Sequence, residues 1–317
     1  MAKRPAAPQK NAAALPMALV VASRGRQCLI ETPQGERIAC QMRGRKLDTI
    51  VGDAVRWRAV HGGGVIETIA PRRTLLYRQD EMRSRLFAAN ISQVLIVLAA
   101  EPAPSLEQLA RALIACEAAH IPALIALNKV DLAAPFAQAR ARLAPYAAAS
   151  YRVLPLCAEA DRAAPPETAP EAALLPLLRA HTTLLLGPSG AGKSTLINRL
   201  IPGAAAETGE ISQALQAGRH TTTATTWYWL DGEKTSALID SPGFQQFGLR
   251  HIEAGQLAAC MPDIAAHTGG CRFYNCTHRA EPGCSVTAAV QRGELAEHRW
   301  QLYCQFYDEC HAASETH

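Results

Sequence analysis

Residues 187–195 read GPSGAGKST, directly after the apolar run TTLLL at 182–186 and just before the amphipathic segment TLINRL at 195–200. A strand, this glycine-rich loop and a helix in that order predict a phosphate-binding site, because glycines let backbone amides turn onto an anion at the helix N-terminus. The residues expected to bind the phosphates are Gly187, Pro188, Ser189, Gly190, Ala191, Gly192, Lys193, Ser194 and Thr195. Lys193 is expected to bridge the terminal phosphates and Ser194 to bind Mg²⁺.

A second phosphate motif is DSPG at 240–243, which ends the strand-like run TSALI at 235–239. By itself, an Asp followed by a Pro-Gly turn indicates only a turn. Together with a phosphate loop it indicates a nucleotide sensor, in which Asp240 holds a magnesium-bound water and the Gly243 amide reaches the γ-phosphate.

The tetrapeptide NKVD at 128–131 predicts selectivity for guanine. The Asp131 carboxylate can accept hydrogen bonds from guanine N1 and its exocyclic amine, and adenine offers no matching pair of donors. We expect Asn128 at the opposite edge of the ring and Lys129 packed over the base. The run LCA at 156–158 is expected to form a second base loop, with Cys157 and a backbone amide near Ala158. The alternative interpretation is a surface loop after a buried strand.

The order of these motifs is unusual, because NKVD and the base loop precede the phosphate loop instead of following it. The motif cycle is that of an ordinary GTP-binding domain cut between its DxxG and NKxD motifs. This indicates a circular permutation, which compact domains tolerate at exposed loops. As a result, the chain after Asp240 runs directly into the C-terminal segment.

The remaining chain indicates three domains. Runs of strand residues at 93–100, 122–131, 151–158 and 182–187 alternate with helix-length segments, and 226–230 with 235–243 form a hairpin-like pair. This pattern predicts a mostly parallel α/β sheet with helices on both faces. Short strand-like runs between residues 18 and 70 predict a five-stranded OB-like barrel. The Pro- and Ala-rich stretch at 159–173 lies within the α/β unit and has no assigned role.

Basic charge is concentrated at the N-terminus. Residues 1–89 contain 16 Lys plus Arg against 7 Asp plus Glu, although the whole chain carries only +4. A basic, strand-rich module favours a polyanionic partner such as RNA, and the alternative is a solvated basic surface. The arginines of the barrel segment are Arg24, Arg26, Arg37, Arg43, Arg45, Arg56 and Arg58. We expect residues 1–16 to be a disordered basic tail of a cytoplasmic protein, with no signal peptide and no membrane partner.

The ten cysteines favour thiols or a metal site over disulfides. CRFYNCTHRAEPGC at 271–284 places Cys271, Cys276, His278 and Cys284 within fourteen residues. Three thiols and one imidazole suit a closed, structural zinc site, which leaves no coordination position for water.

The chain resembles the bacterial RsgA family of circularly permuted GTPases that depend on the small ribosomal subunit. The resemblance covers nearly the whole chain: the barrel, the permuted GTPase motifs, the form Cys-x₄-Cys-x-His-x₅-Cys, GRHTTT at 218–223 as the first switch and DSPGF as the second. It implies a GTPase that binds ribosomal RNA, acts late in small-subunit maturation and is stimulated by the subunit, with one structural zinc and with magnesium bound alongside GTP. Cys157 departs from the serine usual in the family's base loop.

The sequence patterns also divide the chain and suggest a catalytic residue. The expected parts are a tail at 1–16, the barrel at 17–75, the permuted GTPase at 76–249 and a helical zinc module at 250–317, in a monomer. Phe244 occupies the position where many GTPases carry a water-orienting Gln, and it cannot form hydrogen bonds. We therefore expect His220 to be catalytic, with Thr222 or Thr221 as a magnesium ligand. The alternative is that His220 only packs or binds RNA. The competing interpretations are an RNA-binding module with a structural nucleotide and an ATP-dependent enzyme. Intact Lys193, Ser194 and Asp240 oppose the first, and Asp131 opposes the second.

Overall fold

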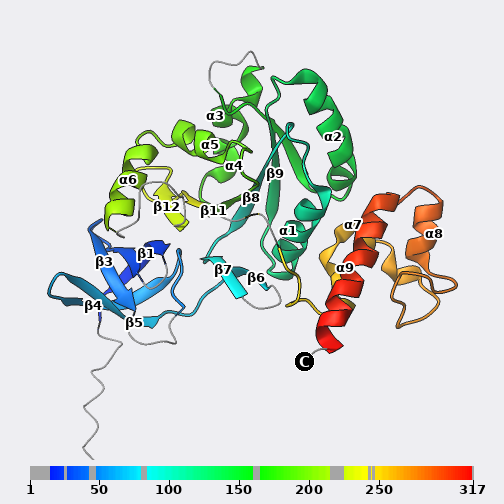
Figure 1. Ribbon diagram of the computed structural model, residues 1–317, viewed down its shortest axis with the longest axis horizontal. Helices are drawn as coiled ribbons and strands as arrows, with labels where there is room; N and C mark the ends of the chain where they lie inside the picture. The colour runs from blue at the N-terminus through cyan, green and yellow to red at the C-terminus, as the bar shows by residue number, and fades with distance from the viewer. Residues whose placement is uncertain are drawn as a thin grey trace, which may run out of the picture.

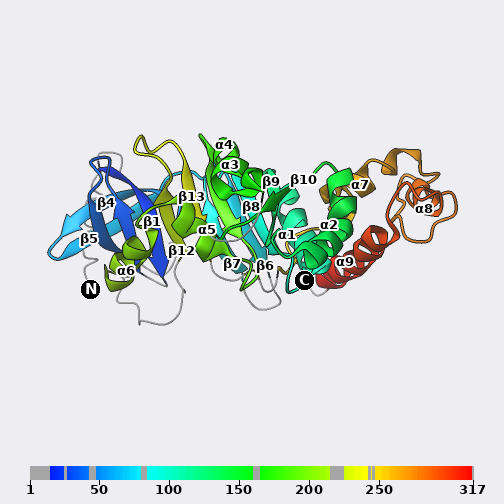
Figure 2. The same cartoon turned by 90° about the horizontal axis from the view of Figure 1, so that it is seen from above.

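The computed structural model describes residues 15–24, 27–42, 48–79, 84–159, 165–214, 225–241, 244 and 247–315. These residues form three parts arranged in a row, with a β-barrel at one end, an α/β domain in the middle and a small helical module at the other end (Figures 1 and 2). This confirms the multidomain fold class expected from the sequence.

The N-terminal part is a closed five-stranded barrel. Its strands follow the order β1-β2-β3-β5-β4, and β4 pairs back onto β1 to close the barrel. The pairs are antiparallel except for β3 and β5, which run parallel. The strands are β1 (Met17–Arg24), β2 (Gln27–Glu31), β3 (Arg37–Met42), β4 (Ala54–Val60) and β5 (Gly63–Ile69). Alternating apolar residues such as Val20, Ile30, Val55 and Ile66 fill the interior.

The central part contains a parallel sheet with one antiparallel strand. Its order is β10-β9-β8-β11-β13-β12, and β12 runs antiparallel to β13. The strands are β8 (Gln93–Ala99), β9 (Ala123–Asn128), β10 (Arg152–Leu156), β11 (Thr182–Leu186), β12 (Thr225–Trp229) and β13 (Ala237–Asp240). A separate hairpin of β6 (Leu75–Gln79) and β7 (Ser84–Ala89) precedes the sheet. All seven residues of β8 are buried, as expected for a parallel strand covered on both faces.

Helices cover both faces of this sheet and produce two cores. One core contains residues of α1 (Leu106–Ala118) and α2 (Ala133–Ala148), and the other contains residues of α5 (Lys193–Leu200). The Ser105 hydroxyl caps α1 by accepting a hydrogen bond from Gln108 N. The shorter helices and the last helix before β12 are η2 (Pro166–Thr168), α3 (Pro170–Ala173), α4 (Leu175–Leu178) and α6 (Ala204–Ala214).

The barrel and the central sheet are continuous, which the sequence analysis did not predict. Strand β1 pairs antiparallel with β12, with Ala22 opposite Thr226 and Ser23 opposite Thr225. The eleven strands therefore form one hydrogen-bonded sheet that runs from β10 into the barrel.

The C-terminal part packs against α1. Its elements are η3 (Ala254–Cys260), α7 (Pro262–Ala265), η4 (Thr268–Gly270), α8 (Ser285–Gln291) and α9 (Glu297–Glu315). Ala110 and Ile114 of α1 share a core with Leu257 and Phe306 of this module. None of the described helices is both long enough and apolar enough to cross a membrane.

Candidate nucleotide site and metal centre

The phosphate loop lies between β11 and α5, and three of its glycines have a positive φ, which L-residues rarely adopt. A Cβ on Gly187 would lie 2.2 Å from the Val97 carbonyl oxygen, and one on Gly192 would lie 2.3 Å from Asn128 Nδ2. The glycines are thus required by backbone angle and by close packing against the neighbouring strands. Ser194 is exposed at the start of α5, where a bound ion could reach its hydroxyl.

Lys193 and Asp240 are the charged pair of the phosphate site. Lys193 Nζ donates to the carbonyls of Gly187 at 2.6 Å and Pro188 at 2.9 Å. Burial lowers the pKa of Lys193, and the charge of Asp240 partly opposes this shift. Burial raises the pKa of Asp240, and Lys193 again opposes it. Both shifts have the same physical cause, namely two charged groups withdrawn from water without a close ion pair.

Asn128 joins the phosphate loop to the base loop. Its Nδ2 donates to Ala191 O and its Oδ1 accepts from Ala158 N, both at 2.9 Å, and its side chain is buried. The sequence analysis assigned Asn128 to the base edge, whereas here both ends of its amide connect loops that are distant in sequence. The Ala158 amide is also occupied by this bond, so its contact with the guanine carbonyl requires an exchange of partners and stays a prediction.

The residues expected on the base side of the site include Lys129, Asp131 and Cys157. The Cys157 thiol lies 3.7 Å from Asp131 Oδ1 and 3.5 Å from Glu159 O, so the NKVD loop and the base loop are in contact. Burial raises the pKa of Cys157, and the negative charge of Asp131 raises it further, so the thiol stays protonated and can donate to the carboxylate. Lys129 has a φ of 70° and donates to Glu101 O at 2.6 Å.

Three supporting residues were missed by the sequence analysis. Arg199 of α5 donates to Cys157 O at 3.1 Å and pairs with Glu171 at 2.8 Å, and Thr168 O accepts from Cys157 N at 2.8 Å. Thr168 and Glu171 belong to the stretch at 159–173 that had no assigned role. Its described part supports the base loop. No sequence signal identifies these contacts, because Arg199 and Glu171 are ordinary surface charges until the chain folds.

The switch residues are only partly described. His220, Thr221, Thr222 and Gly243 lie outside the described residues, and the expectations for them stay predictions. Phe244 is described and buried, with its ring 5.9 Å from that of Phe247 in the main core. Phe244 therefore cannot orient a water molecule.

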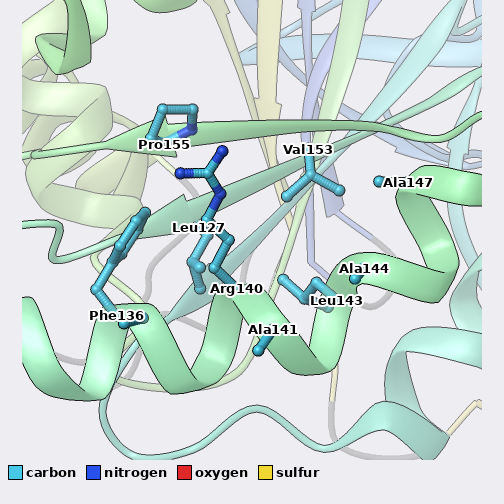
Figure 3. Close-up of a pocket in the computed structure, with 10 residues that line it drawn as sticks. Leu127, Phe136, Arg140, Ala141, Leu143, Ala144, Ala147, Val153 and Pro155 are labelled. Atoms are coloured by element: carbon cyan, nitrogen blue, oxygen red, sulfur yellow. The ribbon is translucent and has the colours of Figure 1, made fainter.

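A hollow of about 640 Å³ lies between α2 and the strands β9 and β10, and none of its lining residues belongs to the phosphate loop (Figure 3). Figure 3 shows side chains of α2, among them Phe136, Arg140 and Leu143, beside Leu127, Val153 and Pro155 of the strands. Of its lining residues only Arg140 carries a charge. The hollow offers no acid–base pair.

The four metal-ligand candidates converge in the C-terminal module. The ligand atoms of Cys271, Cys276, His278 and Cys284 all lie within 4.8 Å of one another. Tetrahedral zinc–thiolate geometry needs neighbouring sulfurs about 3.7 Å apart, so the cluster has the size and the donor set for zinc. His278 Nδ1 lies 3.3 Å from Cys271 Sγ, and burial lowers the pKa of this imidazole, which favours the neutral form that binds metal. All ten cysteines have free thiols, so none of them forms a disulfide.

Sequence comparisons agree with this arrangement. Residues 69–250 match the family model described as RsgA GTPase. The chain is 55% identical over 295 residues to the small ribosomal subunit biogenesis GTPase RsgA of Variovorax paradoxus, covering 92% of this chain and 91% of that protein. It is 46% identical over 310 residues to the protein of the same name from Burkholderia pseudomallei, covering 97% of this chain and 96% of that protein.

Solved structures with the same architecture also match. The crystal structure of YjeQ from Thermotoga maritima matches with a TM-score of 0.70 and 27% identity, covering 93% of this chain and 98% of that one. The structure of YloQ, titled a circularly permuted GTPase, matches with a TM-score of 0.65 and 24% identity, covering 96% and 98%. The second likeness concerns the fold alone.

Proposed function

This chain belongs to the RsgA GTPase family, and on that premise we propose that it hydrolyses GTP on the small ribosomal subunit and acts late in maturation of that subunit. The observation that carries the proposal is the bridge made by Asn128 between Ala191 and Ala158. The bridge brings the expected base loop and the phosphate loop into one site, which supports binding of a whole nucleotide. The intact Lys193, Ser194 and Asp240 favour hydrolysis over an RNA-binding module that keeps a structural nucleotide.

The binding roles follow from the positions of the side chains. Lys193 would exchange its two loop carbonyls for the terminal phosphates, since an anion restores the charge balance lost through burial. Ser194 and Thr222 would hold magnesium with Asp240 nearby, and the ion would neutralise charge that develops on the phosphates. Asp131 would select guanine, and the Cys157 thiol would hold its carboxylate in place.

We assign the catalytic role to His220. Phe244 is buried and cannot activate water, so another polar group must do so. Positioned acid–base groups contribute roughly 10² to 10⁴ in rate. His220→Ala should therefore lose most subunit-stimulated turnover while keeping GTP affinity and subunit binding. Single-turnover hydrolysis on saturating small subunits measures this, and a rate within about threefold of the parent excludes a catalytic His220.

RNA binding is assigned to the barrel, with fewer arginines than the sequence suggested. Arg37 binds Glu31 and Glu207, Arg58 binds Glu67, and Arg56 donates to Leu15 O. Arg26, Arg43 and Arg45 lie outside the described residues, and contact between them and RNA phosphates stays a prediction. We also propose a monomeric, cytoplasmic protein with one structural zinc, divided at residues 17–75, 76–249 and 250–317.

A phosphate-release assay tests the function directly. The protein is incubated with GTP or ATP, with and without purified small or large subunits, and its co-sedimentation is followed with GDP or a non-hydrolysable GTP analogue. We expect GTP hydrolysis that rises only with small subunits, and binding that depends on the GTP state. Asp131→Asn provides the specificity control, because the new amide favours xanthine over guanine. Stimulation by large subunits, or equal use of ATP, contradicts the proposal.

A further inference from the structure

Two exposed aromatic side chains occupy the loop between the first two metal-ligand candidates. Among the described residues, the exposed large hydrophobic side chains are Val60, Phe273 and Tyr274. Tyr274 has a relative exposure of 102% and its neighbour Phe273 one of 41%. Adjacent aromatic side chains exposed to solvent are unfavourable in free energy, and such exposed apolar patches often mark a site that contacts a partner.

The loop that carries them is fixed at both ends. Cys271 and Cys276 flank it within the metal cluster. Arg272 N donates to Gly283 O at 3.1 Å, and Cys276 N donates to Phe273 O at 3.3 Å. The cluster and these bonds already hold the backbone of the loop. Binding of a partner to the rings therefore costs little backbone conformational entropy.

The charges around the rings favour an anionic partner. The Arg272 guanidinium lies 5.5 Å from the centre of the Phe273 ring, and this arginine makes no ion pair with any described residue. The only acid between Cys271 and Cys284 is Glu281, whose carboxylate accepts from Thr277 N at 2.6 Å and from Arg279 N at 3.2 Å. The tip therefore combines two aromatic rings and a free cation, and its one carboxylate is bound to its own backbone.

We propose that Phe273 and Tyr274 form a stacking platform for unpaired RNA bases of the small subunit. Single-stranded RNA is bound by aromatic faces with arginine nearby, and every base offers a face of this kind. The inference rests on the proposed function for the identity of the RNA and adds a contact separate from the barrel. It predicts that the C-terminal module binds RNA through rings more than through charge.

A matched pair of substitutions separates stacking from mere apolarity. Tyr274→Phe keeps the ring, and Tyr274→Leu keeps an apolar side chain without one. Stacking on one base corresponds to about a 5-fold to 150-fold change in affinity. We expect Tyr274→Leu to weaken small-subunit binding at least about fivefold and Tyr274→Phe to change it less than twofold. Zinc content and GTP affinity should not change, because the side chain is fully exposed. Equal affinity of the two variants overturns the proposal.

Crosslinking identifies the partner. After ultraviolet irradiation of the complex, we expect a nucleotide adduct on the tryptic peptide 273–279. Crosslinks from this peptide to ribosomal protein alone overturn the proposal. If the parent protein does not bind small subunits at all, the proposed function is wrong. The same two variants are then compared on a single-stranded oligoribonucleotide, where loss of binding by Tyr274→Leu alone still supports the platform.

Discussion

Two arginines perform the same task at opposite ends of the GTPase domain. Arg37 of the barrel binds Glu31 of its own domain at 3.1 Å and Glu207 of α6 at 2.5 Å. Arg111 of α1 binds Glu107 of its own helix at 2.9 Å and Glu309 of α9 with two bonds at 2.6 and 2.7 Å. Each arginine therefore links one glutamate within its domain to one across a junction.

The two junctions differ in what else holds them. At the barrel junction, β1 and β12 share backbone hydrogen bonds, and Glu31 also accepts from Trp229 Nε1 and Lys234 Nζ. Burial alone would raise the pKa of Glu31, but the bonds from Lys234, Trp229 and Arg37 hold it below its ordinary value. At the C-terminal junction an isolated β-bridge pairs Gln79 with Leu249, and the other described contacts come from side chains, including the Arg111 guanidinium 4.4 Å from the Phe306 ring.

Backbone pairing connects the barrel to the strand that carries Asp240. Thr226 of β12 pairs with Ala22 of the barrel on one side and with Asp240 on the other. A single strand thus separates the barrel from the expected magnesium site. The C-terminal module has no such strand, so its position depends on interlocking side chains and on its own internal stability. The comparison predicts that the barrel junction tolerates side-chain changes better.

The largest effect is expected from Cys276→Ser, which removes one ligand from the metal cluster. Structural zinc supplies folding free energy on the order of 10 kcal/mol in small modules. We expect zinc loss and rapid proteolysis after residue 250, while GTP affinity is preserved because none of the expected nucleotide-binding residues belongs to the metal cluster. Zinc analysis and limited proteolysis measure this, with Cys304→Ser as the control thiol outside the cluster. A protease-resistant, zinc-free variant would contradict a structural metal.

A smaller effect is expected from Arg111→Met. Methionine keeps an unbranched stem like that of arginine but loses the guanidinium and with it both hydrogen bonds to Glu309. A bidentate, partly buried ion pair contributes more stabilising free energy than an ordinary surface pair. We therefore expect docking of the C-terminal module to weaken by about 1 kcal/mol. Hydrogen exchange in α9 should rise about fivefold. Arg292→Met is the matched control, because its pair with Glu294 lies within the module. Unchanged exchange in α9 would show that the shared apolar core alone fixes the module.

The smallest effect is expected from Arg37→Met at the barrel junction. The backbone pairing of β1 with β12 remains, and Glu31 keeps Lys234 and Trp229 as partners. We expect hydrogen exchange in β12 to change less than twofold, a free-energy difference below about 0.5 kcal/mol. An effect on β12 as large as that of Arg111→Met on α9 would remove the distinction between the two junctions.

The sequence by itself determined the features that depend on local spacing. The glycines of residues 187–195, the motif order that reveals the permutation, and the cluster from Cys271 to Cys284 are each contained within a short stretch or a simple order of stretches. Strand and helix periodicity likewise predicted the sheet and the barrel, because the spacing of apolar residues along the chain shows which face of an element is buried.

Only the tertiary structure decided which distant residues meet. Asn128 lies 63 residues from Ala191, Arg199 lies 42 from Cys157, and Glu31 lies 203 from Lys234. Each pair consists of ordinary polar groups whose partners depend on how strands and helices pack, and no local pattern encodes that choice. The pairing of β1 with β12 has the same origin, because a strand edge carries identical backbone groups whatever its sequence. The sequence therefore specified the chemical groups of the site, and packing specified how they are held.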